Sequence, residues 1–169
     1  MIRLSDFFCS LESNNIKFYT GVPDSLLSEL SKYIEIHKKE EHVIASSEGS
    51  AISMALGYHL ATKNTAAVYL QNSGLGNCVN PLVSLANKEI YSIPMCLIIG
   101  WRGEPNIKDE PQHIVQGRVT LEQLKLLDIP YIVIGQDAEI DKIKNEFKTK
   151  ISEGEEFNSK NNDDLAPIT

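Results

Sequence analysis

The alternation of strand-like and helix-like segments is the feature that most limits what this chain can fold into. Five short, largely apolar runs have the length and composition of β-strands. They are residues 17–21, 42–45, 65–70, 94–100 and 130–135. Apolar residues recur at helical spacing at 3–13 and 25–36, and small residues are frequent at 49–61. Helices are expected in these three segments, from Asn77 to about Asn87, at 120–127 and at 138–151.

Strands that alternate with helices of this length predict a doubly wound α/β domain over residues 1–151. Its sheet should be mainly parallel, with helices on both faces. Folds of this kind bind ligands beyond the carboxyl ends of the strands. Four loops that follow predicted strands should therefore meet at one edge of the sheet. They are residues 21–25, 46–50, 71–77 and 100–113.

Composition excludes several classes of function. The net charge is −7 and the basic residues are scattered, which argues against a nucleic-acid-binding face. No run approaches the roughly 18–20 apolar residues that cross a bilayer, and the first residues lack a signal-peptide pattern. We therefore expect a cytoplasmic protein with no membrane partner, and a mobile tail or linker at 152–169, which is acidic and rich in Asn.

The three cysteines are Cys9, Cys78 and Cys96. Because they are odd in number and widely spaced, they are expected to be reduced, buried thiols and not a disulfide framework. Neither they nor the four histidines show the spacing of metal ligands, so no metal site is expected within the chain.

Glu48 is the first candidate for chemistry. It lies between a predicted strand and a predicted helix, in the run SSEGSA. The helix dipole favours an acidic residue in a first helical turn, and this explanation alone would account for Glu48. However, Gly49 lowers helix stability without a local reason. The small residues that follow it would let a ligand or another backbone approach closely.

A resemblance to a known family rests on the run SEGSAISMALGYHLATKNTAAVYLQNSGLGNCVNPL and on two shorter motifs, GVPDS at residues 21–25 and DEPQH at residues 109–113. The sequence that contains these motifs is similar to the pyrimidine-binding domain of thiamine diphosphate-dependent enzymes, and more narrowly to phosphonopyruvate and sulfopyruvate decarboxylases. The resemblance extends over residues 1 to about 150. It implies the thiamine diphosphate-binding fold and the decarboxylation of a 2-keto acid.

The same resemblance gives Glu48 a role. In that family a carboxyl at this position is hydrogen-bonded to ring nitrogen N1′ of the cofactor. There it favours the tautomer whose amino group accepts the proton of the thiazolium carbon. The resemblance therefore implies that Glu48 is catalytic, that it binds the cofactor, and that it does not attack the substrate.

The polar turn at residues 72–77 has two explanations. Its glycines suit a strand-to-helix loop in which Ser73 or Asn77 caps the next helix. The resemblance implies instead that the turn contacts the aminopyrimidine of the cofactor, and the two explanations are compatible. The cofactor contacts implied are Asn72, Ser73, Gly74 and Leu75.

The substrate side of the site is expected to include Asp24, Ser25, Arg102 and His113. Asp24 suits a helix N-cap, and its charge would repel an acidic substrate, so it is expected to orient a donor. Either Arg102 or Arg118 could bind two phosphonate oxygens. His113 is predicted to be catalytic, because imidazole exchanges a proton near neutral pH.

Half of the expected site is absent from the sequence. The family binds the diphosphate through Mg²⁺ held by a separate domain whose signature begins Gly-Asp-Gly, and this run occurs nowhere here. The chain is therefore expected to be one subunit or one part of a longer chain. It would bind thiamine diphosphate and Mg²⁺ together with a partner domain or β subunit, in a homo- or hetero-oligomer.

The expected reaction converts 3-phosphonopyruvate to phosphonoacetaldehyde and carbon dioxide, in phosphonate biosynthesis. The nearest alternative is the α subunit of a sulfopyruvate decarboxylase, because sulfonate and phosphonate have similar shapes. An alternative of another class is a non-catalytic α/β binding or regulatory module. Such a module would have no need of a carboxylate at the start of a helix rich in small residues.

Overall fold

A four-stranded parallel sheet forms the centre of the computed structural model, which describes residues 3–135 and residue 145. The strands lie in the order β2-β1-β3-β4. Their bounds are β1 (Ile16–Gly21), β2 (His42–Ile44), β3 (Thr65–Gln71) and β4 (Met95–Gly100). The inner residues of β3 are all buried, as expected for a central strand covered on both faces.

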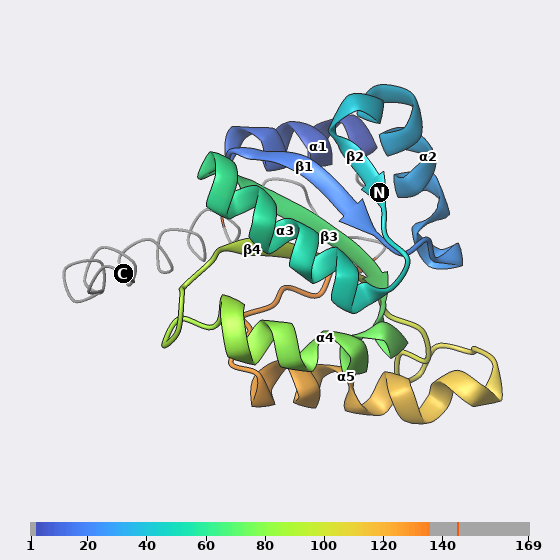
Figure 1. Ribbon diagram of the computed structural model, residues 1–169. Helices are drawn as coiled ribbons and strands as arrows, with labels where there is room; N and C mark the ends of the chain where they lie inside the picture. Colours follow the sequence, from blue (N-terminus) through green and yellow to red (C-terminus); the bar gives the residue numbers. More distant parts are fainter. Residues whose placement is uncertain (1–2, 136–144, 146–169) are drawn as a thin grey trace.

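Helices cover both faces of the sheet (Figure 1). One face carries α1 and α2, which pack against Tyr19, Ala67 and Tyr69. The other carries α3, α4 and α5, which pack against Ala66 and Val68. The bounds are α1 (Leu4–Ser13), α2 (Ser28–His37), α3 (Glu48–Thr62), α4 (Leu75–Pro81) and α5 (Ile114–Leu126). This arrangement confirms the predicted doubly wound α/β fold.

Short helical turns shape the loops. The 3-10 turns are η1 (Ser25–Leu27), η2 (Lys39–Glu41), η3 (Asn72–Gly74) and η5 (Pro111–His113), and η4 (Leu82–Ala86) is a π-helical turn. Three of them, η1, η3 and η5, lie between the carboxyl end of a strand and the next helix. The chain therefore begins to coil directly at the edge where ligands are expected. η4 follows Pro81, whose missing N–H removes a regular helical hydrogen bond.

A close backbone contact joins β1 to β3. A Cβ at Gly21 would lie 2.0 Å from the carbonyl oxygen of Tyr69 and 2.7 Å from its ring, so only glycine fits at this position. The Tyr69 hydroxyl lies 2.8 Å from Nε2 of His42 on β2. Because β1 lies between these two strands, the bare backbone of Gly21 lets Tyr69 reach across it.

In the C-terminal half one predicted helix is longer than expected and one predicted strand is wrong. The helix predicted at 120–127 is confirmed as α5, but it begins earlier, at Ile114, and Gly117 does not interrupt it. A Cβ at Gly117 would lie only 1.7 Å from the carbonyl oxygen of Gly103, so packing requires glycine inside α5. Residues 130–135 form no strand, and Val133 and Ile134 are each 48% exposed. Pro130 has no N–H to donate to a neighbouring strand, and this weakens pairing at the start of that segment.

Other predictions meet mixed outcomes. The cysteines are free thiols, but Cys9 is exposed, contrary to expectation, while Cys78 is buried. The predicted helix at 138–151, the domain end at residue 151 and the tail at 152–169 lie outside the described residues. Among the residues that the structure describes, no helix is both long and apolar enough to cross a membrane.

Candidate active site

The carboxyl ends of β1 and β3 mark a change of direction in the sheet. From β1 the chain moves outward to β2 through α2, and it then returns past β1 to β3 through α3 on the opposite face. Ligands of doubly wound folds bind at such a switch point. Figure 1 shows that the arrowheads of β1 and β3 and the first turns of α3, α4 and α5 lie at this end of the molecule. The predicted convergence of the four loops is therefore confirmed.

Glu48 is the first residue of α3, at this edge of the sheet. Ser47 caps the helix, since its Oγ accepts a hydrogen bond from the Ser50 amide at 3.2 Å. The Glu48 side chain is half-buried, and its Oε2 accepts a hydrogen bond from Nδ2 of Asn77 at 2.9 Å. Its other oxygen, Oε1, has no hydrogen-bond partner within the described part of the chain. One oxygen is thus fixed and the other is available to a ligand.

Two glycines let the starts of α3 and α4 interlock around this carboxyl. A Cβ at Gly74 would lie 2.4 to 2.6 Å from Cγ, Cδ and Oε1 of Glu48. A Cβ at Gly49 would lie 2.9 Å from the carbonyl oxygen of Asn77. Gly49 at the start of α3 therefore makes room for Asn77, and Gly74 before α4 makes room for Glu48. This close contact explains why a glycine stands at position 49, although glycine lowers helix stability.

A buried thiol lies behind the carboxyl. Burial, together with the nearby charge of Glu48, raises the pKa of Cys78 to about 12. Its Sγ donates to the carbonyl oxygen of Gly74 at 3.4 Å. Cys78 is therefore a neutral packing group at working pH and adds no second negative charge beside Glu48.

The turn at 72–75 has a different internal structure from the predicted cap. Neither Ser73 nor Asn77 caps α4: the Ser73 hydroxyl accepts a hydrogen bond from Gln71, and Asn77 bonds to Glu48. Gly74 and Leu75 are buried, with Gly74 directly against the Glu48 carboxyl. The turn thus shapes the space around Glu48 through its backbone.

Asn72 is fully buried, and its side chain is already committed within the protein. Its Nδ2 donates to the carbonyl oxygen of Arg102 and to Oγ1 of Thr120, each at 2.8 Å. Its Oδ1 accepts from the Arg102 amide at 3.2 Å. These bonds tie the end of β3 to the loop after β4 and to α5. Contact of Asn72 with the cofactor stays a prediction.

Of the residues expected from the sequence to bind the substrate, the structure brings Asp24, Ser25 and Arg102 together. Asp24 is buried and caps η1, with Oδ2 accepting from the Leu26 amide at 3.2 Å, so its predicted capping role is confirmed. A Cβ at Gly100 would lie 2.3 Å from this same oxygen. The Ser25 hydroxyl accepts from Nη1 of Arg102 at 3.1 Å. Arg118 is exposed on α5.

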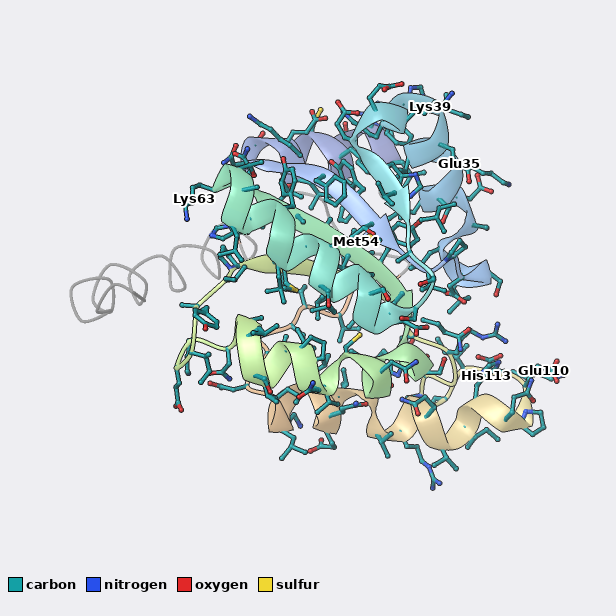
Figure 2. The ribbon with its side chains drawn as sticks, in the orientation of Figure 1. Glu35, Lys39, Met54, Lys63, Glu110 and His113 are labelled. Carbon is teal, nitrogen blue, oxygen red and sulfur yellow. The ribbon has the colours of Figure 1, made fainter. Side chains whose placement is uncertain are left out.

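His113 lies at the end of η5, immediately before α5, and is partly exposed. Figure 2 shows His113 and Glu110 at the end of the molecule where α5 begins, the end towards which the strands point. The backbone there is tightly packed: Gly103 has a φ of +69°, and a Cβ on it would lie 2.0 Å from the His113 carbonyl oxygen. The loop after β4 therefore fixes the place of His113.

Two residues that contact predicted site residues were missed from the sequence. Asn77 was expected as a helix cap, and Asp109 was noted only as part of the DEPQH motif. Each pairs with a residue that the chain brings near only when it folds, Asn77 with Glu48 and Asp109 with Arg102. The Gly49 and Gly74 positions were the available signal, because glycines beside a candidate carboxylate indicate a close approach.

The surroundings of Glu48 fit the aminopyrimidine end of thiamine diphosphate. Gly74 leaves the room that the Glu48 carboxyl occupies, and Oε1, which has no hydrogen-bond partner in the described part of the chain, could accept a hydrogen bond from a ring nitrogen or donate one to it. The diphosphate end has no comparable place: in the described residues, no group of three or more His, Cys, Asp or Glu could hold a metal ion.

Comparison with known proteins supports the assignment of the doubly wound α/β fold. Residues 5–126 match the family described as thiamine pyrophosphate enzyme, N-terminal TPP binding domain, where thiamine pyrophosphate is another name for thiamine diphosphate. Among solved structures, benzoylformate decarboxylase from Polynucleobacter necessarius aligns with a TM-score of 0.52 at 17% identity. That alignment covers 88% of this chain and 36% of the other.

Curated relatives are more similar in sequence. Phosphonopyruvate decarboxylase of Streptomyces hygroscopicus is 35% identical over 147 residues, which are 87% of this chain and 35% of that protein. Sulfopyruvate decarboxylase subunit alpha of Methanocaldococcus jannaschii is 37% identical over 122 residues, which are 72% of this chain and 69% of that protein. The chain spans about a third of the first relative and more than two thirds of the second. With the family match covering most of its length, the chain belongs to the thiamine pyrophosphate enzymes and carries their N-terminal cofactor-binding domain.

Proposed function

We propose that this chain is the pyrimidine-binding half of a thiamine diphosphate-dependent carboxy-lyase, with Glu48 as its catalytic carboxyl. The observation that carries the proposal is the setting of Glu48. Its carboxyl lies at the switch point of the sheet, with one oxygen fixed by Asn77 and the other beside the bare backbone of Gly74. A non-catalytic binding module would not need this arrangement.

The protein groups have distinct tasks in this proposal. Thiamine diphosphate supplies the carbon nucleophile and accepts the electrons released when carbon dioxide leaves. With the cofactor bound, Glu48 would exchange a proton at Oε1 and Asn77 would hold the carboxyl in place. The backbone of the turn at 72–75 would help to hold the pyrimidine. Asp24 and Ser25 border the substrate, and His113 transfers a proton there.

We infer that the substrate is a 2-keto acid with a second anionic group, 3-phosphonopyruvate, and that the product enters phosphonate biosynthesis. Support comes from two phosphonopyruvate decarboxylases that are 35% and 37% identical and align over 87% and 79% of this chain. Sulfopyruvate is the second candidate, because three sulfopyruvate decarboxylase alpha subunits are 34% to 37% identical. The two substrates differ mainly in charge.

The proposal includes a partner that holds Mg²⁺ and the diphosphate. Relatives named subunit alpha, and relatives of which this chain spans only a third, both support a second domain or chain. The completed site would then lie between two domains. We further propose that the protein acts in the cytoplasm, where its free thiols would stay reduced.

Turnover of both substrates tests the proposal. The chain would be produced together with its Mg²⁺-binding partner, loaded with thiamine diphosphate and Mg²⁺, and assayed for carbon dioxide release from phosphonopyruvate and from sulfopyruvate. We expect activity that is lost in Glu48→Gln, with a higher kcat/KM for phosphonopyruvate. A higher value for sulfopyruvate would select the second candidate, and no release from either would reject the decarboxylase proposal.

A further inference from the structure

Arg102 and Asp109 form a forked ion pair inside the loop that follows β4. Arg102 Nε donates to Oδ2 at 2.9 Å, and Nη2 donates to Oδ1 at 2.5 Å. The two side chains are only 18% and 16% exposed. The third guanidinium nitrogen, Nη1, donates to the Ser25 hydroxyl at 3.1 Å. Every nitrogen of this guanidinium therefore donates a hydrogen bond within the chain, and Asp109 occupies the fork formed by Nε and Nη2.

Asp109 has further bonds that fold the loop around it. Its Oδ2 accepts from the Gly103 amide at 2.7 Å, and its Oδ1 accepts from the Glu110 amide at 2.8 Å. The hydrogen bonds from Arg102, and then the one from the Gly103 amide, hold the pKa of Asp109 well below its usual range. The carboxylate is therefore ionised throughout the neutral range, and it closes the loop between Gly103 and Glu110.

This loop is attached to three other parts of the site. The backbone of Arg102 is bound on both sides by the Asn72 side chain, at the end of β3. Its guanidinium holds Ser25, after β1. The Trp101 ring nitrogen donates to the Gly117 carbonyl oxygen on α5 at 2.9 Å. The ion pair thus sits where the substrate side of β1, the cofactor side of β3 and the start of α5 are joined.

We infer that Arg102 and Asp109 are a positioning pair. They lock the loop at 101–113 and hold Ser25 beside it, and Arg102 does not itself bind the substrate anion. The effect on catalysis rests on the proposed function, whereas the locking of the loop does not. This role differs from the one expected for Arg102 from the sequence, in which its guanidinium meets the phosphonate.

Amide hydrogen exchange on the full 169-residue chain tests the locking without cofactor or partner. Arg102→Gln leaves Asp109 in place but removes the fork that orients it. We expect exchange at the Gly103 and Glu110 amides to become about tenfold faster or more, since hydrogen bonds to charged groups are among the stronger ones. Lys108→Gln, an exposed charge change in the same loop, should leave both rates unchanged. Unchanged rates at the two amides in Arg102→Gln would overturn the inference.

Kinetics of the assembled enzyme separate positioning from anion binding. If the pair positions the loop, Arg102→Gln, Asp109→Asn and the double variant should all lower kcat/KM to a similar extent, because either change unlocks the same loop. If Arg102 binds the substrate, Asp109→Asn should leave KM unchanged or lower it, while Arg102→Gln alone raises KM. That second pattern would refute the positioning role. A wild-type assembly without activity would reject the proposed function and leave the exchange result to decide the locking.

Discussion

Two effects act on the same carboxyl at Glu48. The first turn of α3 favours a negative charge there, and the contact with Gly74 limits where the side chain can point. Asn77 then selects one of the two oxygens as its partner. At the scale of single residues, the site therefore depends on how the Glu48 carboxyl is oriented, and less on how many charged groups surround it.

Glu48→Gln tests the carboxyl itself. Gln keeps the size of the side chain and an oxygen that can accept from Asn77, but it has no exchangeable carboxyl proton. In the assembled enzyme we expect hydrogen–deuterium exchange at the thiazolium carbon to slow by about 10²–10⁴, the usual contribution of one acid–base group. Circular dichroism should show an unchanged fold. Equal exchange rates in the variant and the wild type would mean that Glu48 is only a helix-terminal acid.

Gly74→Ala tests the space beside that carboxyl. The new methyl would overlap Cγ and Cδ of Glu48, so we expect the side chain to be displaced and stability to fall by about 1–3 kcal/mol, as for an overpacked site. Decarboxylase activity should fall even at temperatures where the variant stays folded.

Gly76→Ala is the matched control, because Gly76 lies two residues after Gly74 in the first turn of α4. A Cβ there meets nothing within 4 Å, so the free energy of unfolding should stay the same or rise by up to about 1 kcal/mol. Thermal unfolding and activity would be measured on both variants. Full activity in Gly74→Ala would show that this contact does not position Glu48.

At the scale of helices and strands, the sequence predicted the first hundred residues closely. All four strands and all four helices of that region lie where local sequence patterns predict them, although the turns η1 and η4 take part of two predicted helices. The C-terminal half depended on distant contacts. Gly117 looks like a helix breaker until Gly103 packs against it, and residues 130–135 resemble a strand although the sheet does not include them.

The candidate site, like the fold, was predicted only in part from the sequence. The helix-start positions of Glu48 and Asp24 could be predicted, whereas the proposed role of Glu48 followed from the family resemblance. The pairs Asn77–Glu48 and Arg102–Asp109 could not be predicted, because the first depends on how two helices approach each other and the second on how one loop folds back on itself. Side-chain partners of this kind leave only an indirect trace in a single sequence.

The partly buried His42 on β2 makes stability depend on pH. Burial lowers the pKa of His42 below its usual value of 6.5 in the folded protein. Above about pH 6.5 the imidazole is neutral in both states and has no effect on the pH dependence. Below that value the unfolded chain binds the proton first, so the free energy of unfolding falls as pH decreases towards the folded pKa.

His42→Phe isolates this contribution. The variant loses the bond to Tyr69 at every pH, but it also loses the titrating group. Urea unfolding of both proteins at pH 7.5 and 5.5 should show a larger decrease for the wild type, since all other titrating groups are shared. The same decrease in both proteins would exclude His42 as the source.

At the scale of the whole molecule, α3 presents an outer face with almost no charge. From Gly49 to Thr62 the helix contains no Asp, Glu, Lys or Arg, although Met54 and Leu60 are 39% and 59% exposed. Figure 2 shows Met54 on α3, apart from the charged residues Glu35 and Lys39 near α2 and β2. Exposed apolar side chains on a helix face without charged residues are often covered by a partner, so we expect the proposed partner domain to contact this face.

Gly57→Glu tests that expectation. A side chain at this exposed position meets nothing within 4 Å, and Glu favours helix more than Gly by up to about 1 kcal/mol, so the chain alone should remain stable. Sedimentation should show at least about tenfold weaker association with the partner, because a charge would be buried without a counterion. Gly57→Ala should associate normally. Normal association of Gly57→Glu would place the interface elsewhere.

The interlocked glycines also bear on how this protein can be engineered. Replacing glycines with alanine is a common route to greater heat resistance, and Gly57 and Gly76 have the open surroundings that make them suitable targets. Gly49 and Gly74 do not, because each holds open the space that its neighbouring helix fills. A directed-evolution library that varies Gly74 alone would mostly sample inactive proteins. One that keeps Glu48 and varies residues 49, 74 and 77 together would allow both helix starts to change at the same time.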